Sequence, residues 1–106
     1  AQAYSELLKG SNLTLPQIPE GDKQVFHLYV VQSDDRDGLA NSLAKEGIST
    51  AIHYPTPMPA MPCYEPLATP AEDYAVSAAA CQRILSLPMF AELTNKEVTK
   101  LALLIP

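Results

Sequence analysis

The sequence has few of the residues that several classes of protein require. Its two cysteines, Cys63 and Cys81, are too few and too far apart for a disulfide framework, so a reducing cytoplasm is the expected compartment. Seven Lys and Arg residues are scattered among twelve Asp and Glu residues, and the net charge of −5 argues against a nucleic-acid partner. The apolar runs, such as 101–105, are far shorter than the ~20 residues of a membrane-spanning helix. No membrane segment is therefore predicted.

Residues that carry chemistry are also scarce. There is no glycine-rich phosphate loop, and no lysine lies in a phosphate-binding context. His53, Cys63 and Cys81 do not have the close, regular spacing of zinc ligands. A nucleophilic thiol needs a basic partner and a lowered pKa, whereas Cys63 follows Pro62 in a loop and Cys81 lies in an alanine-rich helix, so both are interpreted as small packing residues. The chain is not expected to bind a metal or a cofactor unaided.

What is present fits one small globular domain. The 106 residues, 47% apolar and 18% charged, match the usual size and composition of a single domain over 1–106. The chain does not begin with Met, which suggests a fragment of a longer protein.

The first half of the chain predicts alternating helices and strands. A helix over 2–9 is expected to end at a left-handed Gly10. The proline-containing residues 11–23 predict an extended connector. The apolar run 24–32 predicts a largely buried strand. N-cap candidates at 33–35 open a short amphipathic helix that ends at Gly47, and the alternating residues 48–54 predict a second strand.

The second half begins with a loop stiffened by five prolines over 55–66. Thr69, Pro70 and Glu72 resemble a capping box that opens an alanine-rich helix to about Leu85. After an interruption at 86–90, a second capping box of Thr94 and Glu97 opens the last helix. This order predicts an α+β fold, a short sheet with helices packed on one side.

Only two histidines could act as a general acid or base near neutral pH. His27 lies within the first predicted strand, so we interpret it as a packed core residue. His53 ends the second predicted strand at the start of the proline loop, a rim position suited to a binding group. Met58, Met61 and Tyr64 in that loop fit two alternatives, an adaptable surface for a partner or packing back onto the core.

Two segments resemble the DegT/DnrJ/EryC1/StrS family of sugar aminotransferases near their C-terminus. The stretch RDGLANSLAKEGISTAIHYPTP, Arg36 to Pro57, is similar to the family's Arg-Asp helix start, its Gly-Ile helix end and its His-Tyr-Pro strand end. The stretch ILSLPMFAELT, Ile84 to Thr94, is similar to the Leu-Ser-Leu-Pro segment before the family's final helix. The two segments occur in the family's order and spacing, and the resemblance covers nearly the whole chain.

The resemblance implies the C-terminal small domain of the aspartate aminotransferase-like fold. In such enzymes a large domain, absent from this chain, carries the lysine, phosphate cup and acidic residue that bind pyridoxal phosphate. The family transfers an amino group from glutamate to a nucleotide-linked keto sugar, in lipopolysaccharide, O-antigen or amino-sugar biosynthesis. The implied partners are the chain's own large domain and a second subunit of a homodimer, and the chain alone is expected to be inactive.

The resemblance also assigns the site residues. His53 and Tyr54 are expected to contact the nucleotide-sugar, because imidazole and phenol groups donate to phosphate or sugar oxygens. Pro59 and Met61 stand where many members have a second His and a Gln, which implies a different substrate or loop path. The alternative hypothesis is a self-standing interaction or ligand-binding module of the same architecture.

Overall fold

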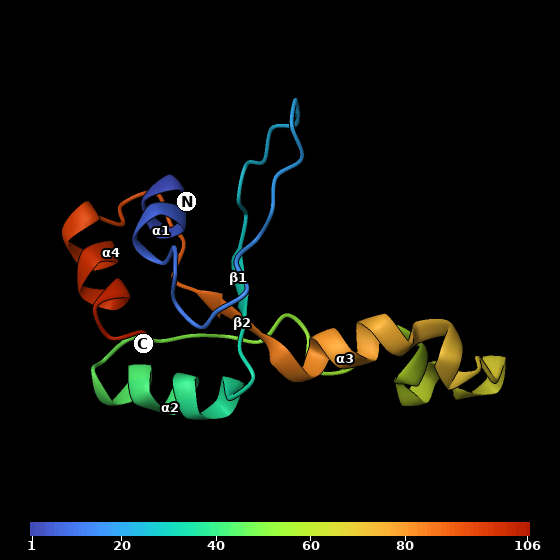
Figure 1. Cartoon of the computed structure of the whole chain (residues 1–106). Helices are drawn as coiled ribbons and strands as arrows, with labels where there is room; N and C mark the ends of the chain where they lie inside the picture. Colours follow the sequence, from blue (N-terminus) through green and yellow to red (C-terminus); the bar gives the residue numbers. More distant parts are fainter.

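A two-stranded antiparallel sheet lies at the centre of the computed structural model, which describes all residues 1–106 (Figure 1). Along the chain the elements are α1 (Gln2–Leu7), β1 (Tyr29–Gln32), α2 (Arg36–Lys45), the 3-10 helices η1 (Met58–Ala60), η2 (Pro62–Leu67) and η3 (Ala71–Tyr74), α3 (Ala75–Arg83), β2 (Ile84–Leu87) and α4 (Asn95–Ala102). The α+β class predicted from the sequence is confirmed.

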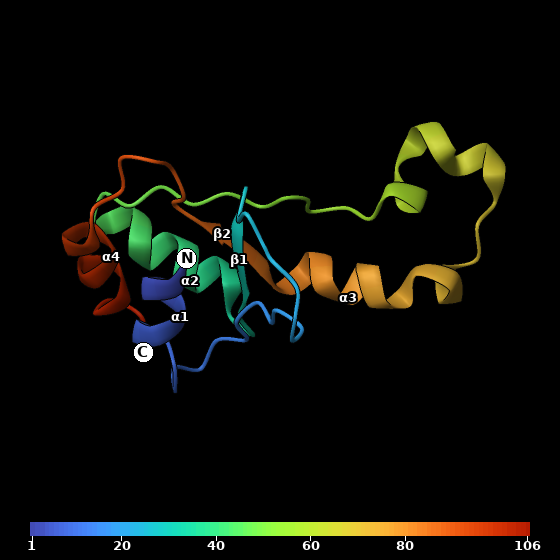
Figure 2. The same ribbon diagram turned by 90° about the horizontal axis from the view of Figure 1, so that it is seen from above.

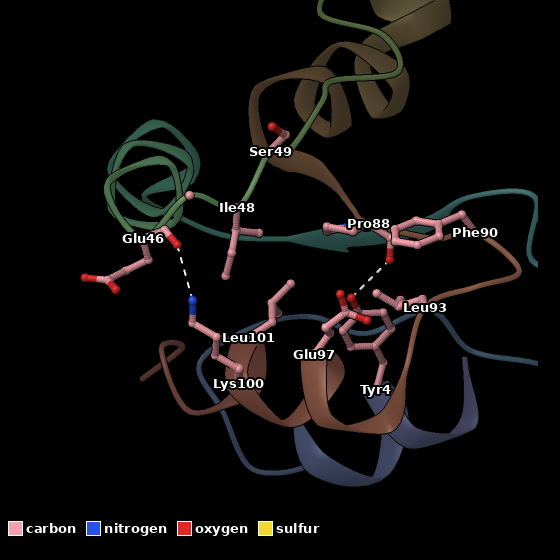
Figure 3. A pocket seen from close by; sticks show the side chains of 11 residues that line it. Tyr4, Glu46, Ile48, Ser49, Pro88, Phe90, Leu93, Glu97, Lys100 and Leu101 are labelled. Carbon is pink, nitrogen blue, oxygen red and sulfur yellow. Dashed lines mark hydrogen bonds between the residues drawn. The ribbon is translucent and has the colours of Figure 1, made fainter.

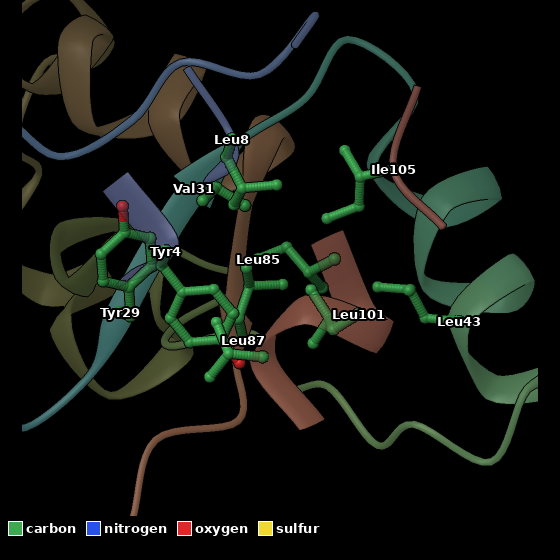
Figure 4. Packing of buried hydrophobic residues seen from close by; sticks show 10 residues of the cluster. Tyr4, Leu8, Tyr29, Val31, Leu43, Leu85, Leu87, Leu101 and Ile105 are labelled. Atoms are coloured by element: carbon green, nitrogen blue, oxygen red, sulfur yellow. The ribbon is translucent and has the colours of Figure 1, made fainter. Parts of the chain in front are cut away.

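The core covers one face of the sheet. In the β1–β2 register Tyr29 lies opposite Leu87 and Val31 opposite Leu85, so these four buried side chains share a face. Side chains from α1 and the residue that follows it, from α2 and α4 and from the C-terminal segment complete the cluster, and Figure 4 labels five of them: Tyr4, Leu8, Leu43, Leu101 and Ile105. Val98 of α4 also belongs to it. The expectation of helices on one side is thus confirmed for α1, α2 and α4.

The helix α3 does not follow this expectation, because it belongs to an arm that points away from the core. Residues 55–83, which include η1, η2, η3 and α3, extend from the sheet on the side opposite α1 and α4 (Figures 1 and 2). The radius of gyration is 15.5 Å, whereas a compact domain of 100 residues has about 13 Å. The arm is therefore exposed on most of its surface.

The first predicted strand is wrong over its N-terminal half. Only Tyr29–Gln32 form β1, while 24–28 lie outside the sheet. Phe26 adopts a positive φ of 52°, which ends extended geometry before the strand begins. Its ring stacks on that of Tyr29 at 5.6 Å, but Val25 is exposed. The apolar residues of this run therefore do not all face the core.

The second predicted strand, 48–54, forms only a single antiparallel bridge between Ala51 and Ser86. Ser86 belongs to β2 (Ile84–Leu87), which the sequence did not predict as a strand. The sequence assigned these residues to the end of a helix and to the interruption that follows it. The four residues Ile84–Leu87 follow α3 without a break, so no turn residue marks the change from helix to strand. What defines β2 is its pairing with β1, a contact distant in sequence.

Two of the three predicted helix starts are confirmed. The Asp35 carboxylate accepts a hydrogen bond from the Gly38 backbone at 3.0 Å, and a Cβ on Gly38 would overlap that carboxylate. Arg36 then connects α2 to the arm, donating from Nη1 to the Cys81 carbonyl at 3.3 Å. The capping box at Thr69 is wrong: η3 begins after an extended Pro70 and has no side-chain cap. Pro70 therefore precedes the helical residues instead of opening them.

The capping box of α4 is confirmed and predicts a pH dependence of stability. Glu97 accepts from the Thr94 hydroxyl at 2.6 Å and from the Thr94 backbone at 2.9 Å, and these bonds lower the pKa of the Glu97 carboxyl below its usual 4.5. A lowered folded-state pKa gives a stability contribution that is present above pH 4.5 and lost as the pH falls through the folded value. Glu97→Gln should therefore reduce the loss of unfolding free energy on acidification.

The measurement is urea unfolding at a series of pH values below and above this range. Glu92→Gln is the matched control, since the exposed Glu92 side chain makes no hydrogen bond in the structure. The control should keep the wild-type slope. Equal slopes for both variants would contradict the assigned role of the Glu97 carboxylate.

Candidate functional site

His53 lies on the face of the sheet opposite the core. After α2, Gly47 takes a positive φ of 76° and turns the chain into an extended segment along the free edge of β2. Ala51 donates to the Ser86 carbonyl at 3.2 Å and accepts from the Ser86 backbone at 2.7 Å. This double hydrogen bond fixes the segment two residues before His53.

The imidazole is anchored by a buried serine. Nδ1 of His53 lies 2.9 Å from Oγ of Ser86, whose residue is only 4% exposed. Since side chains alternate along a strand, Ser86 points away from the core side on which Leu85 and Leu87 lie. Nε2 of His53 makes no hydrogen bond and is accessible to solvent. The free nitrogen is therefore the one that a ligand can reach.

Tyr54 stands beside His53 on the open surface. Its side chain is 66% exposed, and its ring meets the His53 ring edge-on with the centroids 5.5 Å apart. The peptide bond between the two residues is cis. An exposed phenol and an imidazole N–H offer two donors for the oxygens of an anionic or hydroxylated ligand. Both residues that the resemblance assigned to substrate contact thus lie on one accessible surface.

The other histidine does not take the expected position. His27 is exposed and lies before β1, so its interpretation as a packed core residue is wrong. One of the two alternatives for the proline loop is wrong: Met58 and Tyr64 are exposed on the arm, and Met61 is half-buried outside the core cluster. These loop residues do not pack onto the core of the domain.

The largest cavity, about 480 Å³, lies away from His53 and Tyr54 (Figure 3). It lies between the end of α2, the end of β2, α1 and α4, and its lining includes Tyr4, Glu97 and Lys100. Tyr4 donates to the Pro88 carbonyl at 3.0 Å, and burial, with smaller effects from Tyr29 and Glu97, raises the pKa of Tyr4 to about 12. Neither His53 nor Tyr54 lines this cavity. The candidate site at His53 and Tyr54 is therefore separate from this cavity.

The chain offers few groups for a metal or a cofactor. No cluster of three or more His, Cys, Asp or Glu side chains could hold a metal ion. All five lysines are exposed, and none is hydrogen-bonded to His53, Tyr54 or Ser86. The donors at the candidate site, a histidine and a tyrosine, suit ligand oxygens but provide no amine for a covalent link to pyridoxal phosphate. None of the helices is long and apolar enough to cross a membrane.

Two solved protein structures contain the same arrangement of elements. DesV from S. venezuelae aligns with a TM-score of 0.87 and 30% identity over 97% of this chain and 28% of that chain. A DegT DnrJ EryC1 StrS aminotransferase from Brucella abortus aligns with a TM-score of 0.83 and 29% identity, covering 97% of this chain and 27% of that chain. The fold of this chain thus matches that of about a quarter of each of these two proteins.

The sequence comparison identifies the family. The model of the DegT/DnrJ/EryC1/StrS aminotransferase family matches residues 1–105. The chain is 37% identical over 103 residues to the UDP-N-acetyl-3-dehydro-alpha-D-glucosamine 3-aminotransferase of Acidithiobacillus ferrooxidans, across 96% of this chain and 27% of that protein. It is 34% identical over 97 residues to the erythromycin biosynthesis sensory transduction protein EryC1 of Saccharopolyspora erythraea, across 91% of this chain and 26% of that protein.

The chain therefore belongs to the DegT/DnrJ/EryC1/StrS aminotransferase family, as the two sequence motifs predicted. It spans about 27% of the length of the curated relatives it matches.

Proposed function

We propose that this chain is the C-terminal small domain of a pyridoxal phosphate-dependent aminotransferase with the aspartate aminotransferase-like fold. The whole enzyme transfers an amino group from glutamate to a nucleotide-linked keto sugar, in the biosynthesis of lipopolysaccharide, other polysaccharides or amino sugars. The observation that carries the proposal is the family match over residues 1–105. Relatives named as UDP-sugar and dTDP-sugar transaminases support the substrate class.

In this proposal His53 and Tyr54 bind the nucleotide-sugar. The solvent-accessible Nε2 of His53 and the exposed hydroxyl of Tyr54 donate to phosphate or sugar oxygens. The backbone pairing of Ala51 with Ser86 holds the pair at the sheet edge, which supports a fixed binding geometry. These residues orient the substrate and do not form covalent bonds with it.

The cofactor belongs to the part of the enzyme that the family's large domain would supply. Pyridoxal phosphate, when bound, acts as the electron sink for transamination. No lysine of this chain lies at the candidate site, which supports placing the covalent attachment in the large domain. The chain's contribution is to position the sugar and to form one wall of the site.

The partners we propose are this large domain and a second subunit of a homodimer. Only 13 of the 106 residues are buried, which is few for a domain of this size and supports extensive contacts with other protein surfaces. The exposed arm carries apolar side chains that none of the core elements covers, namely Met58, Leu67 and Val76. Two free cysteines, Cys63 and Cys81, support the cytoplasm as the compartment.

The test is an assay of the whole protein that contains this chain, reconstituted with pyridoxal phosphate. With glutamate as donor it should aminate keto sugars linked to UDP or dTDP, tested with the keto group at each ring carbon, and mass spectrometry of the sugar product detects the amine. The same keto sugars lacking the nucleotide are the matched control and should react poorly, because the proposed contacts of His53 include phosphate. Absence of amination across the UDP and dTDP series would overturn the proposal.

Binding measurements on the isolated 106-residue chain distinguish the proposed function from that of a self-standing ligand-binding module. Pyridoxal phosphate added to the chain should produce no stoichiometric absorbance change, and nucleotide-sugar should bind weakly. A stoichiometric cofactor signal would contradict the division of labour between the domains. Tight binding of nucleotide-sugar to the chain alone would favour the module.

A further inference from the structure

We propose that Ser86 is a positioning residue that sets the tautomer and orientation of His53, so that Nε2–H donates to the substrate. The inference rests on the proposed role of His53 in substrate binding. It concerns a residue of β2 that lies 33 positions along the chain from His53 and does not contact the ligand itself.

The position of Ser86 is fixed by the sheet from both sides. Its residue pairs with Val30 of β1 in the strand register and with Ala51 through two backbone hydrogen bonds of 2.7 and 3.2 Å. The side chain is 4% exposed and lies on the face opposite the core. The hydroxyl is therefore a rigid support beneath the imidazole.

Burial determines which atom donates. A serine hydroxyl has a single proton to donate, and the one hydrogen-bond partner of Ser86 Oγ is Nδ1 of His53. If Nδ1 were the donor, the hydroxyl proton would be left buried without an acceptor, which destabilises the fold. The hydroxyl therefore donates to Nδ1, and the proton of the neutral imidazole lies on Nε2.

This tautomer suits the proposed ligand. Nε2 of His53 is accessible to solvent and makes no hydrogen bond within the chain, so the Nε2–H is free to donate to a phosphate or sugar oxygen. The neutral ring can thus donate without first acquiring a proton. Loss of Ser86 Oγ would free the ring to rotate and to place an unprotonated nitrogen toward the substrate.

The test combines nitrogen NMR with substrate kinetics on the whole protein. The ring nitrogens of ¹⁵N-histidine-labelled protein are assigned to His53 by the signals missing in His53→Ala. In the wild type, above the pH at which the ring is protonated, we expect an unprotonated Nδ1 and a protonated Nε2. Ser86→Ala should give a mixture of tautomers, and Ser86→Thr, which keeps the hydroxyl, should restore the wild-type pattern.

The kinetics separate positioning from a general structural effect. Ser86→Ala should raise KM for the keto sugar about five- to tenfold, the effect of one lost hydrogen bond, with kcat changed much less. In the His53→Ala background the same substitution should add almost nothing, because Ser86 acts through His53. Ser42→Ala, on the exposed surface of α2, is the matched control and should leave KM unchanged.

The outcomes distinguish this inference from the proposed function. If His53→Ala raises KM but Ser86→Ala changes neither KM nor the tautomer, the positioning role is overturned while the proposed function stands. A full additional rise of KM in the double variant also overturns it. If His53→Ala leaves KM unchanged, the substrate-binding role of His53 fails, and the inference fails with it.

Discussion

Replacing Leu85 by alanine is expected to lower the free energy of unfolding by about 2–5 kcal/mol. This is the range for a buried leucine side chain that is truncated and leaves a cavity in the core. Leu85 is 1% exposed and lies opposite Val31 in the sheet, on the face that packs against α1, α2 and α4. Figure 4 shows its side chain near the middle of the cluster, close to Leu101. The loss removes contacts that join the sheet to the helices.

Leu103→Ala is the matched control, because it removes the same atoms from a side chain that is 82% exposed. Its effect should stay within about 0.5 kcal/mol. Urea unfolding followed by circular dichroism gives both values, and the slope with denaturant reports whether the transition stays two-state. Similar destabilisation by the two variants would show that the cluster around Leu85 is not the main source of stability.

The sequence predicted those elements whose signals are local. Each helix cap joins residues that lie within four positions in the sequence, and both predicted caps are present in the structure. They are Asp35 before α2 and the Thr94–Glu97 capping box of α4. Gly10 and Gly47 take the positive φ expected after a helix. These features depend on backbone geometry over one turn, so the residues themselves are sufficient to specify them.

Strand boundaries depend on pairing partners that are distant in sequence, and the predicted strand bounds were wrong. β2 is a strand because it pairs with β1 and with Ala51, neither of which is visible in the four residues Ile84–Leu87. The run 24–32 has strand-forming residues throughout, yet only its last four residues have a pairing partner. The alanine-rich segment after Thr69 gave a helix signal, but it could not indicate that this helix would leave the core.

The candidate site was predicted in part. The resemblance assigned His53 and Tyr54, and the structure places both at the sheet edge with accessible donor groups. Ser86 was missed as a member of the site, although it lies inside the second motif that carried the resemblance, Ile84 to Thr94. The signal was a polar residue in an otherwise apolar run. Without the pairing of 51 with 86, nothing in the sequence connects that residue to His53.

His53→Ala in the whole enzyme is expected to raise KM for the nucleotide-sugar roughly 10- to 100-fold, the effect of losing one hydrogen bond to a charged oxygen. The affinity for pyridoxal phosphate, followed by its absorbance, should not change, since the proposed cofactor site lies in the large domain. The kcat should change less than KM, because the residue is proposed to bind the substrate and not to transfer protons.

The second histidine of the chain provides the matched control for this substitution. His27 is exposed and lies before β1, outside the candidate site, so His27→Ala should leave KM and cofactor binding at the wild-type values. A separate comparison of Tyr54→Phe with wild type isolates the phenol donor, because that change keeps the exposed ring and removes one hydroxyl. An unchanged KM in His53→Ala, or a loss of cofactor absorbance with it, would refute the assignment of His53 as a substrate contact.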